Sequence, residues 1–305
     1  MVHAITASTV KFGGFSPVKP IPNTLTAVKD HTRVFGDLTF VYPVISRRSR
    51  GLSIGINLNP DKKCNFDCVY CEVDRRTPGL ASRVDLAKLQ DELRWLIRFA
   101  RDGELGKAPP FNEAPELTRV IRDLAFSGDG EPTMVPNFDA CVRAVIEIKE
   151  SEGLTDAKLV LITDAAGLDK GSVKAGLALM DQNHGEIWGK LDAGTPAYYR
   201  QVNRSAIPFE RILSNLLETA RVRPIIIQSL FLKIHGQAMT DPELQAYCER
   251  LNVITRAGGK IREVHAYTIA RPTPEVWATR LERVELSQIA EAIRKNTGLP
   301  VELFD

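Results

Sequence analysis

Short apolar runs rich in β-branched residues alternate with amphipathic helical stretches along most of this chain. The expected strands are residues 52–58, 122–126, 158–162, 186–191, 224–230 and 262–269. About six strand–helix units in strict alternation predict a parallel sheet with right-handed crossovers. At 305 residues, the chain is rather short for a complete eightfold barrel preceded by a forty-residue leader. We therefore expect an α/β fold, a partial (β/α)6 TIM-like barrel with an N-terminal extension.

The stretches between these strands carry their apolar residues on one helical face. The expected helices cover residues 86–100, 138–148, 209–220 and 244–254. Residues 1–40 are rich in Pro, Gly, Thr and Val, and we expect them to form an extension that packs on the main domain. The core is expected to span residues 41–275, and a C-terminal segment, residues 276–305, follows it.

The composition sets few limits on function. Hydrophobic residues make up 44% of the chain, charged residues 26%, and the formal net charge is +2. This charge neither demands nor excludes a nucleic-acid partner. No apolar run approaches the roughly 20 residues of a membrane span, and the sequence does not open on a signal-peptide pattern. We therefore expect a cytoplasmic protein without a membrane partner.

Three of the five cysteines lie within eight residues of one another, just after the first expected strand. Cys64, Cys68 and Cys71 form a C-x-x-x-C-x-x-C run. One loop with this spacing can wrap three thiolates around a single inorganic centre, and thiolates suit iron–sulfur clusters. A structural site closes its coordination shell, whereas a catalytic site leaves one position open. The missing fourth cysteine therefore indicates a catalytic cluster.

Two other interpretations of the cysteine loop remain open. One is a structural zinc with a distant fourth ligand such as His184 or His235, although zinc sites usually contain paired cysteine or histidine elements. The other is a disulfide, which a cytoplasmic setting disfavours. Cys141 and Cys248 fall on the apolar faces of expected helices, and we expect them to pack in the core.

The C-x-x-x-C-x-x-C run, with Tyr70 before its last cysteine, resembles the defining motif of the radical S-adenosylmethionine (SAM) superfamily. The resemblance implies that Cys64, Cys68 and Cys71 hold a [4Fe–4S] cluster and that SAM chelates its remaining iron. It implies reductive cleavage of SAM to methionine and a 5′-deoxyadenosyl radical, which abstracts a hydrogen atom from the substrate. It also implies that Tyr70 lies near the adenine.

A glycine-rich turn follows the second expected strand. Its sequence SGDGEPT, residues 127–133, resembles the G-G-E-P element that holds the SAM amino group in this superfamily. The resemblance makes Ser127, Gly128, Gly130 and Glu131 cofactor-binding residues. Glycines let backbone carbonyls approach an ammonium group closely, and Glu131 supplies countercharge. Asp129 stands where the commoner motif has a second adjacent glycine.

Polar residues also lie just past the ends of the other expected strands, on the face where α/β barrels build their active sites. Thr163, Asp164, Lys190 and Asp192 are candidates to bind the SAM ribose and carboxylate, or the substrate. Lys233 and His235, after the fifth expected strand, either face the substrate or lie on the rim.

Longer segments resemble one branch of the superfamily, the Fe–S oxidoreductases related to the wybutosine-forming tRNA enzymes. These segments are YPVISRR (42–48), KKCNFDCVYCEVDR (62–75), KLDAGTPAYYRQVNR (190–204) and VHAYTIARPTPE (264–275). The tRNA enzymes bind a second cluster through additional N-terminal cysteines, and this sequence has no cysteine before Cys64. The wybutosine reaction and its pyruvate-binding lysine are therefore not transferred. Arg47, Arg48 and Arg50 either contact phosphate groups of RNA or a small substrate, or form a solvated loop.

We therefore expect a radical SAM enzyme that acts on a small molecule or a nucleoside, with its reaction type unresolved. Its cofactors would be the [4Fe–4S] cluster and SAM, and an external one-electron reductant of the flavodoxin or ferredoxin type would supply the electron. One alternative is an enzyme that modifies tRNA or a protein. The other is a non-enzymatic metal-binding module.

Overall fold

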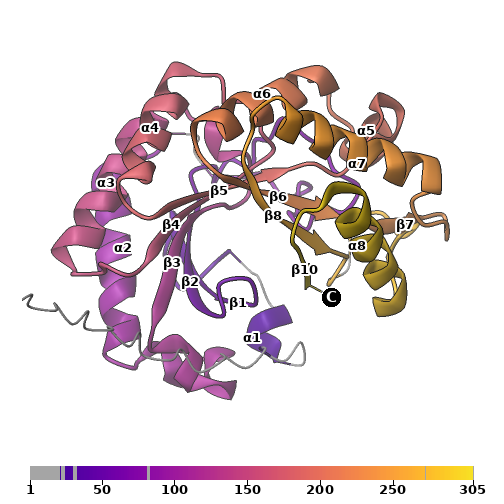
Figure 1. Cartoon of the computed structure of the whole chain (residues 1–305). Helices are drawn as coiled ribbons and strands as arrows, with labels where there is room; N and C mark the ends of the chain where they lie inside the picture. The colour runs from indigo at the N-terminus through magenta and orange to yellow at the C-terminus, as the bar shows by residue number, and fades with distance from the viewer. Residues whose placement is uncertain (1–20, 22–24, 30–32, 81–82, 272, 305) are drawn as a thin grey trace, which may run out of the picture.

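The alternation in the sequence builds one curled sheet (Figure 1). The computed structural model describes residues 21, 25–29, 33–80, 83–271 and 273–304. The sheet has eight strands in the order β1-β2-β3-β4-β5-β6-β8-β10. They are β1 (Val41–Ser46), β2 (Gly51–Ile56), β3 (Ile121–Phe126), β4 (Lys158–Thr163), β5 (Gly185–Lys190), β6 (Ile225–Leu230), β8 (Ile261–Tyr267) and β10 (Val301–Phe304). β1 is antiparallel to β2, and every other neighbouring pair in the sheet is parallel.

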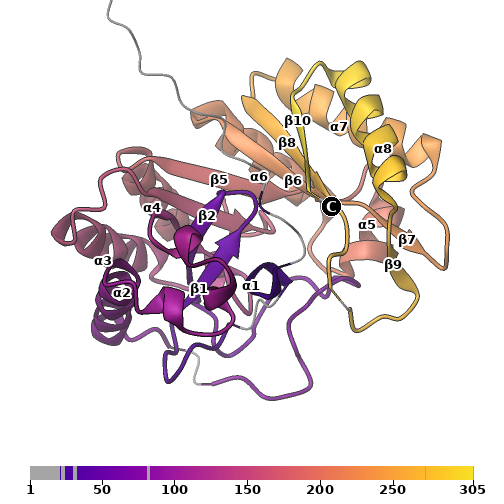
Figure 2. The same ribbon diagram turned by 90° about the horizontal axis from the view of Figure 1, so that it is seen from below.

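Helices follow the strands and cover the convex side of the sheet (Figure 1). The α-helices are α1 (Thr26–Lys29), α2 (Leu86–Arg101), α3 (Phe138–Ser151), α4 (Gly171–Asp181), α5 (Pro196–Asn203), α6 (Phe209–Val222), α7 (Asp241–Arg256) and α8 (Arg283–Thr297). Four short 3-10 helices span Leu105–Lys107, Phe111–Glu113, Pro115–Thr118 and Pro132–Met134. A separate two-stranded ribbon pairs β7 (Leu232–Ile234) with β9 (Ala278–Arg280), outside the main sheet (Figure 2). None of the helices within the described residues is long and apolar enough to cross a membrane.

The core lies between the convex side of the sheet and the helices. Helix α2 illustrates its construction: Leu89, Leu93 and Leu96 recur at helical spacing and are fully buried. Burial of each such side chain stabilises the fold by about 1.5–3 kcal/mol. The Asp85 carboxylate accepts a hydrogen bond from Lys88 N and caps the helix, so the local sequence fixes where it starts.

The predicted partial TIM-like barrel is confirmed, with the six expected strands in the expected order. The sheet is wider than expected, because β1 and β10 add one strand at each edge. Pro43 lies within β1, a position that only an edge strand tolerates. β10 has only four residues, too few to show a strand period. Most of the predicted extension, namely residues 1–20, 22–24 and 30–32, lies outside the described residues.

The two edge strands lie on either side of the opening of the curled sheet (Figure 1). The turn between β1 and β2 spans this opening, since Arg50 Nη2 donates a 2.9 Å hydrogen bond to Glu302 Oε1 on β10. The concave side of the sheet carries a small apolar cluster of its own, formed by Ala125, Val160, Trp188 and Ile226. Above this cluster, the loops that follow the strands surround a cavity.

Candidate active site

A cavity of about 290 Å³ lies on the concave side of the sheet, and its lining runs from the turn between β1 and β2 to the loops at the carboxyl ends of the strands. Its lining brings together most of the residues predicted from the sequence: Cys64, Cys68, Tyr70, Cys71, Ser127, Gly128, Gly130, Glu131, Thr163, Asp164 and Lys190. These residues lie at or just after the ends of four different strands, β2, β3, β4 and β5, so only the fold can place them on one surface. Asp192 is close by but does not line the cavity.

The cysteine loop follows β2 and presents three sulfurs to the cavity. Each sulfur accepts one hydrogen bond: from Phe66 N to Cys64 Sγ (3.5 Å), from Asn203 Nδ2 to Cys68 Sγ (3.5 Å) and from Arg75 Nη2 to Cys71 Sγ (3.6 Å). Donors of this kind stabilise thiolates and tune iron–sulfur clusters. The donor set therefore fits a cluster held by thiolates.

The spacing of the sulfurs argues against a single zinc ion. Within the described part of the chain, the trio of possible metal-ligand atoms that lie within 4.8 Å of one another comes from Glu263, His265 and Glu302. The three cysteine sulfurs are therefore not all within 4.8 Å of one another. Thiolates on one zinc ion, each about 2.3 Å from the metal, must lie closer than that. Neither His184 nor His235 lines the cavity. Cys141 and Cys248 are buried in α3 and α7, as their apolar helix positions predict.

The surroundings of Cys64 and Cys68 disfavour their thiolate forms. Burial, reinforced by the neighbouring Asp164 carboxylate, raises the pKa of the Cys64 thiol to about 11. Burial raises the pKa of Cys68 to about 12, although Lys190 acts in the opposite direction. A metal that binds these sulfurs must therefore displace protons and supply the missing positive charge.

The glycine-rich turn after β3 packs directly against the cysteine loop. A Cβ atom on Gly130 would collide with the carbonyl oxygen of Lys63, and one on Gly128 would collide with the side chain of Asn57. Asn57 Nδ2 donates to Asp129 Oδ2 (2.7 Å), and Asp129 N donates to Asn57 Oδ1 (3.2 Å). The glycines thus allow the two loops to approach, and Asn57 fixes the turn between them.

Glu131 is buried, and its carboxylate is engaged by the protein. It accepts hydrogen bonds from Thr133 N (3.0 Å), Thr133 Oγ1 (2.6 Å), Thr163 Oγ1 (2.6 Å) and Asp164 N (2.7 Å). These bonds tie the turn after β3 to the end of β4. Burial and the nearby Glu131 charge raise the pKa of Asp164 well above its ordinary value. The raised pKa of Asp164 favours the protonated form of this carboxyl group beside the cysteines.

Asp192 acts on the cavity through Tyr70. The Tyr70 hydroxyl donates to Asp192 Oδ2, which also accepts from Asn203 Nδ2 at 2.8 Å. Leu230 N donates to Asp192 Oδ1 at 2.9 Å. The Lys190 ammonium lies 5.2 Å from the centroid of the Tyr70 ring. Asp192 thus holds the ring in place, and Lys190 completes this wall of the cavity.

Sequence reasoning missed Asn57, Arg75 and Asn203. Arg75 follows Cys71 by four residues, so proximity to the sulfurs was a usable signal. Asn57 and Asn203 gave none, because each reaches the site only through the fold. Neither Lys233 nor His235 lines the cavity. Lys233 pairs with Glu285 (2.8 Å), and His235 stacks on Trp277.

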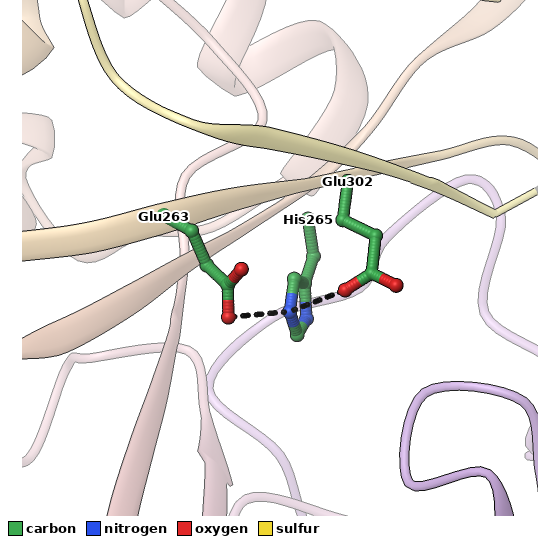
Figure 3. Close-up of side chains that lie close together, drawn as sticks. All are labelled: Glu263, His265 and Glu302. Carbon is green, nitrogen blue, oxygen red and sulfur yellow. Dashed lines mark ion pairs between the residues drawn. The ribbon is translucent and has the colours of Figure 1, made fainter. Parts of the chain in front are cut away.

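Toward the amino ends of the strands, charged side chains on the concave side pair with one another. His265 Nε2 lies 3.4 Å from Glu263 Oε1 and 4.0 Å from Glu302 Oε2 (Figure 3). These three residues are the trio of close ligand atoms. Arg262 and Arg50 pair with the two carboxylates. The trio is therefore part of an ion-pair network that the protein itself neutralises.

No known family model matches the sequence. A GTPase Obg of Brachyspira hyodysenteriae is 27% identical over 277 residues, 89% of this chain. This chain spans 35% of the length of that protein. The sequence of this chain contains no G-x-x-x-x-G-K-S/T phosphate-binding motif. A UPF0026 protein of Synechocystis is 26% identical over 239 residues, 77% of each chain. A UPF0026 protein of Methanocaldococcus jannaschii is 27% identical over 184 residues, 59% of this chain and 49% of that one.

Among solved structures, TYW1 with a bound lysine–pyruvate adduct has a similar fold. Its TM-score is 0.55 at 13% sequence identity, over 82% of this chain and 75% of that one. The chain therefore shares its fold with TYW1. The resemblance to the wybutosine-type branch that the sequence motifs predict is confirmed at the level of the fold.

Proposed function

We propose that this chain is a radical SAM enzyme that acts on a small molecule or a nucleoside. The observation that carries the proposal is the cysteine loop: three sulfurs line one cavity, each with its own hydrogen-bond donor, beside a glycine-rich turn. Cys64, Cys68 and Cys71 would hold a [4Fe–4S] cluster. With SAM bound, that cluster would supply the electron for reductive cleavage of SAM to methionine and a 5′-deoxyadenosyl radical.

The other residues would bind and orient SAM. Backbone carbonyls of the turn around Gly128 and Gly130 would accept hydrogen bonds from the amino group, and Glu131 would contribute negative charge. Lys190 would bind the carboxylate, and Thr163 and Asp164 would bind the ribose. Tyr70, held by Asp192, would provide a flat surface for the adenine. Ser127, which lies 3.1 Å from the Tyr42 hydroxyl, completes the wall.

The substrate is not taken over from the similar proteins. The lysine–pyruvate adduct belongs to TYW1, whose likeness to this chain is one of fold. A tRNA or protein substrate stays an alternative prediction, and salt-sensitive RNA binding would favour the tRNA. The cytoplasmic location and the flavodoxin- or ferredoxin-type reductant are likewise predictions.

Anaerobic reconstitution tests the proposal. Protein loaded with iron and sulfide should bind about four irons per chain, and with SAM and a strong reductant it should release 5′-deoxyadenosine. Well-loaded protein that releases none would overturn the enzymatic proposal. About one zinc per chain without inorganic sulfide would instead support the metal-binding module.

A further inference from the structure

Arg48, in the turn between β1 and β2, places its guanidinium among three aromatic rings. Its Cζ atom lies 4.7 Å from the ring centroid of Tyr267 and 5.9 Å from those of Trp188 and Phe304. The rings belong to β8, β5 and β10, so they hold the guanidinium from three strands. Aromatic faces attract and orient a guanidinium but do not neutralise its charge.

No described carboxylate lies within ion-pair distance of Arg48. Its neighbour Arg50 does pair with a carboxylate, Glu302, at 2.9 Å. Burial lowers the pKa of Arg48 from its ordinary value, although Tyr267 partly opposes the shift. Arg48 is half-buried, and a cation held among apolar groups is normally paired with an anion. The missing anion at Arg48 therefore points to a ligand.

Two other polar groups on the cavity wall also lack partners. Gln228 is 1% exposed, and its Nε2 atom has no hydrogen-bond partner among the described residues. The Tyr267 hydroxyl makes no hydrogen bond to any described residue. Both side chains line the same cavity as Arg48 and the cysteines. A guanidinium, an amide and a hydroxyl without acceptors form a wall that is rich in donors and poor in acceptors.

We propose that Arg48, Tyr267 and Gln228 bind an oxyanion, a carboxylate or a phosphate, that the substrate carries. This inference rests on the proposed function and names the substrate class of the same site. The site belongs to the substrate rather than to SAM because of where Arg48 enters the cavity. The turn that carries Arg48 precedes β2, whereas the cysteine loop follows it, so the two approach from opposite ends of the strand. Lys190 lies 5.2 Å from the centroid of the Tyr70 ring, on the cofactor side, and it also interacts electrostatically with Tyr267.

Titration of the full-length chain tests the inference, with and without cluster reconstitution. Methyl phosphate and acetate serve as probes, and the fluorescence of Trp188 reports binding because its ring flanks Arg48. Trp188→Phe identifies the signal among the three tryptophans. We expect saturable binding of one probe, and the preferred probe tells whether the substrate carries a carboxylate or a phosphate. Binding that persists when no cluster forms separates this inference from the proposed function.

Arg48→Met removes the charge and keeps the apolar stem, and Arg50→Gln is the matched control on the same turn. We expect Arg48→Met to weaken probe binding at least about tenfold, the loss of one charged hydrogen bond, and Arg50→Gln to leave it unchanged. Without probe, Arg48→Met should keep the thermal midpoint of the wild type, because the methionine side chain still packs against the rings and the removed charge has no ion-pair partner among the described residues. Absence of saturable binding, wild-type binding by Arg48→Met, or a clear fall in its midpoint would overturn the site.

Discussion

The two ends of the concave face differ in how they treat charge. Toward the amino ends of the strands, Lys158, Glu186 and Arg262 pair within 2.6–3.0 Å, and the pairing continues through Glu263 to Glu302 and Arg50. Toward the carboxyl ends, the buried Cys68 thiol, whose pKa is raised, lies near Lys190. From the turn between β1 and β2, the Arg48 guanidinium reaches Tyr267 at the end of β8, and no described residue pairs with it. The first end pairs its charges within the protein, although the buried Nδ1 atom of His265 has no hydrogen-bond partner among the described residues. At the second end, the proposed ligands would supply the missing charges.

The largest effect should come from a cluster ligand. Cys68→Ser replaces the most buried sulfur of the loop with a hydroxyl, a poor ligand for iron. Loss of residues that merely support a metal ligand costs about 10–100-fold in affinity or activity, so loss of the ligand itself should cost more. Iron and sulfide content and 5′-deoxyadenosine yield measure this. Cys141→Ala, at a buried position of α3, is the control, and this variant should keep the cluster in the cysteine loop. If Cys68→Ser kept a full cluster, Cys68 would not be a cluster ligand, and the carboxyl ends of the strands would not differ from the amino ends in the way proposed.

Glu131→Gln should be the largest stability effect. The glutamine amide would turn an N–H donor toward Asp164 N, which now donates to Glu131 Oε2 at 2.7 Å. A lost charged hydrogen bond and a buried donor without an acceptor together cost about 2–3 kcal/mol. Denaturant unfolding of the SAM-free protein measures the cost. Glu147→Gln is the control, because the Glu147 carboxylate is an exposed group that accepts a hydrogen bond from Gln90 Nε2. Equal stability of the two variants would mean that Glu131 does not tie β3 to β4.

Glu186→Gln probes the paired end and should have a smaller, pH-dependent effect. Burial alone would raise the pKa of Glu186, but Lys158 and Arg262 lower it below its ordinary value. Its stabilising contribution is therefore present above the ordinary carboxyl pKa and is lost as the pH falls through the lowered one. Because both cations are about half exposed, we expect a cost of only about 1 kcal/mol at pH 7.

Thermal unfolding of Glu186→Gln and wild type between pH 7 and pH 3 checks this sign. The two curves should converge as the pH falls. If the difference in thermal midpoint between the two proteins did not change with pH, packing rather than charge would explain the effect of Glu186→Gln.

The sequence predicted the parts of the molecule that repeat or that gather in one loop. The six strands follow from local apolar runs, and Cys64, Cys68 and Cys71 lie in one segment. Arg48 shows what could not be predicted. Its place in a basic run suggested a solvated loop as readily as a binding site, and only the fold brings Tyr267 and Phe304 around it. Asn203 likewise reaches Cys68 from 135 residues away.

The smallest effect should come from the link across the opening of the sheet. Glu302→Gln breaks the pair with Arg50, whose side chain is 51% exposed. Exposed pairs contribute about 0.2–1 kcal/mol and are screened by salt. We expect a loss of less than about 0.5 kcal/mol in 0.15 M salt and none in 1 M salt. A double-mutant cycle with Arg50→Gln isolates the pair. A coupling above about 2 kcal/mol would mean that this contact, rather than the backbone ladder between β8 and β10, holds the edge of the sheet in place.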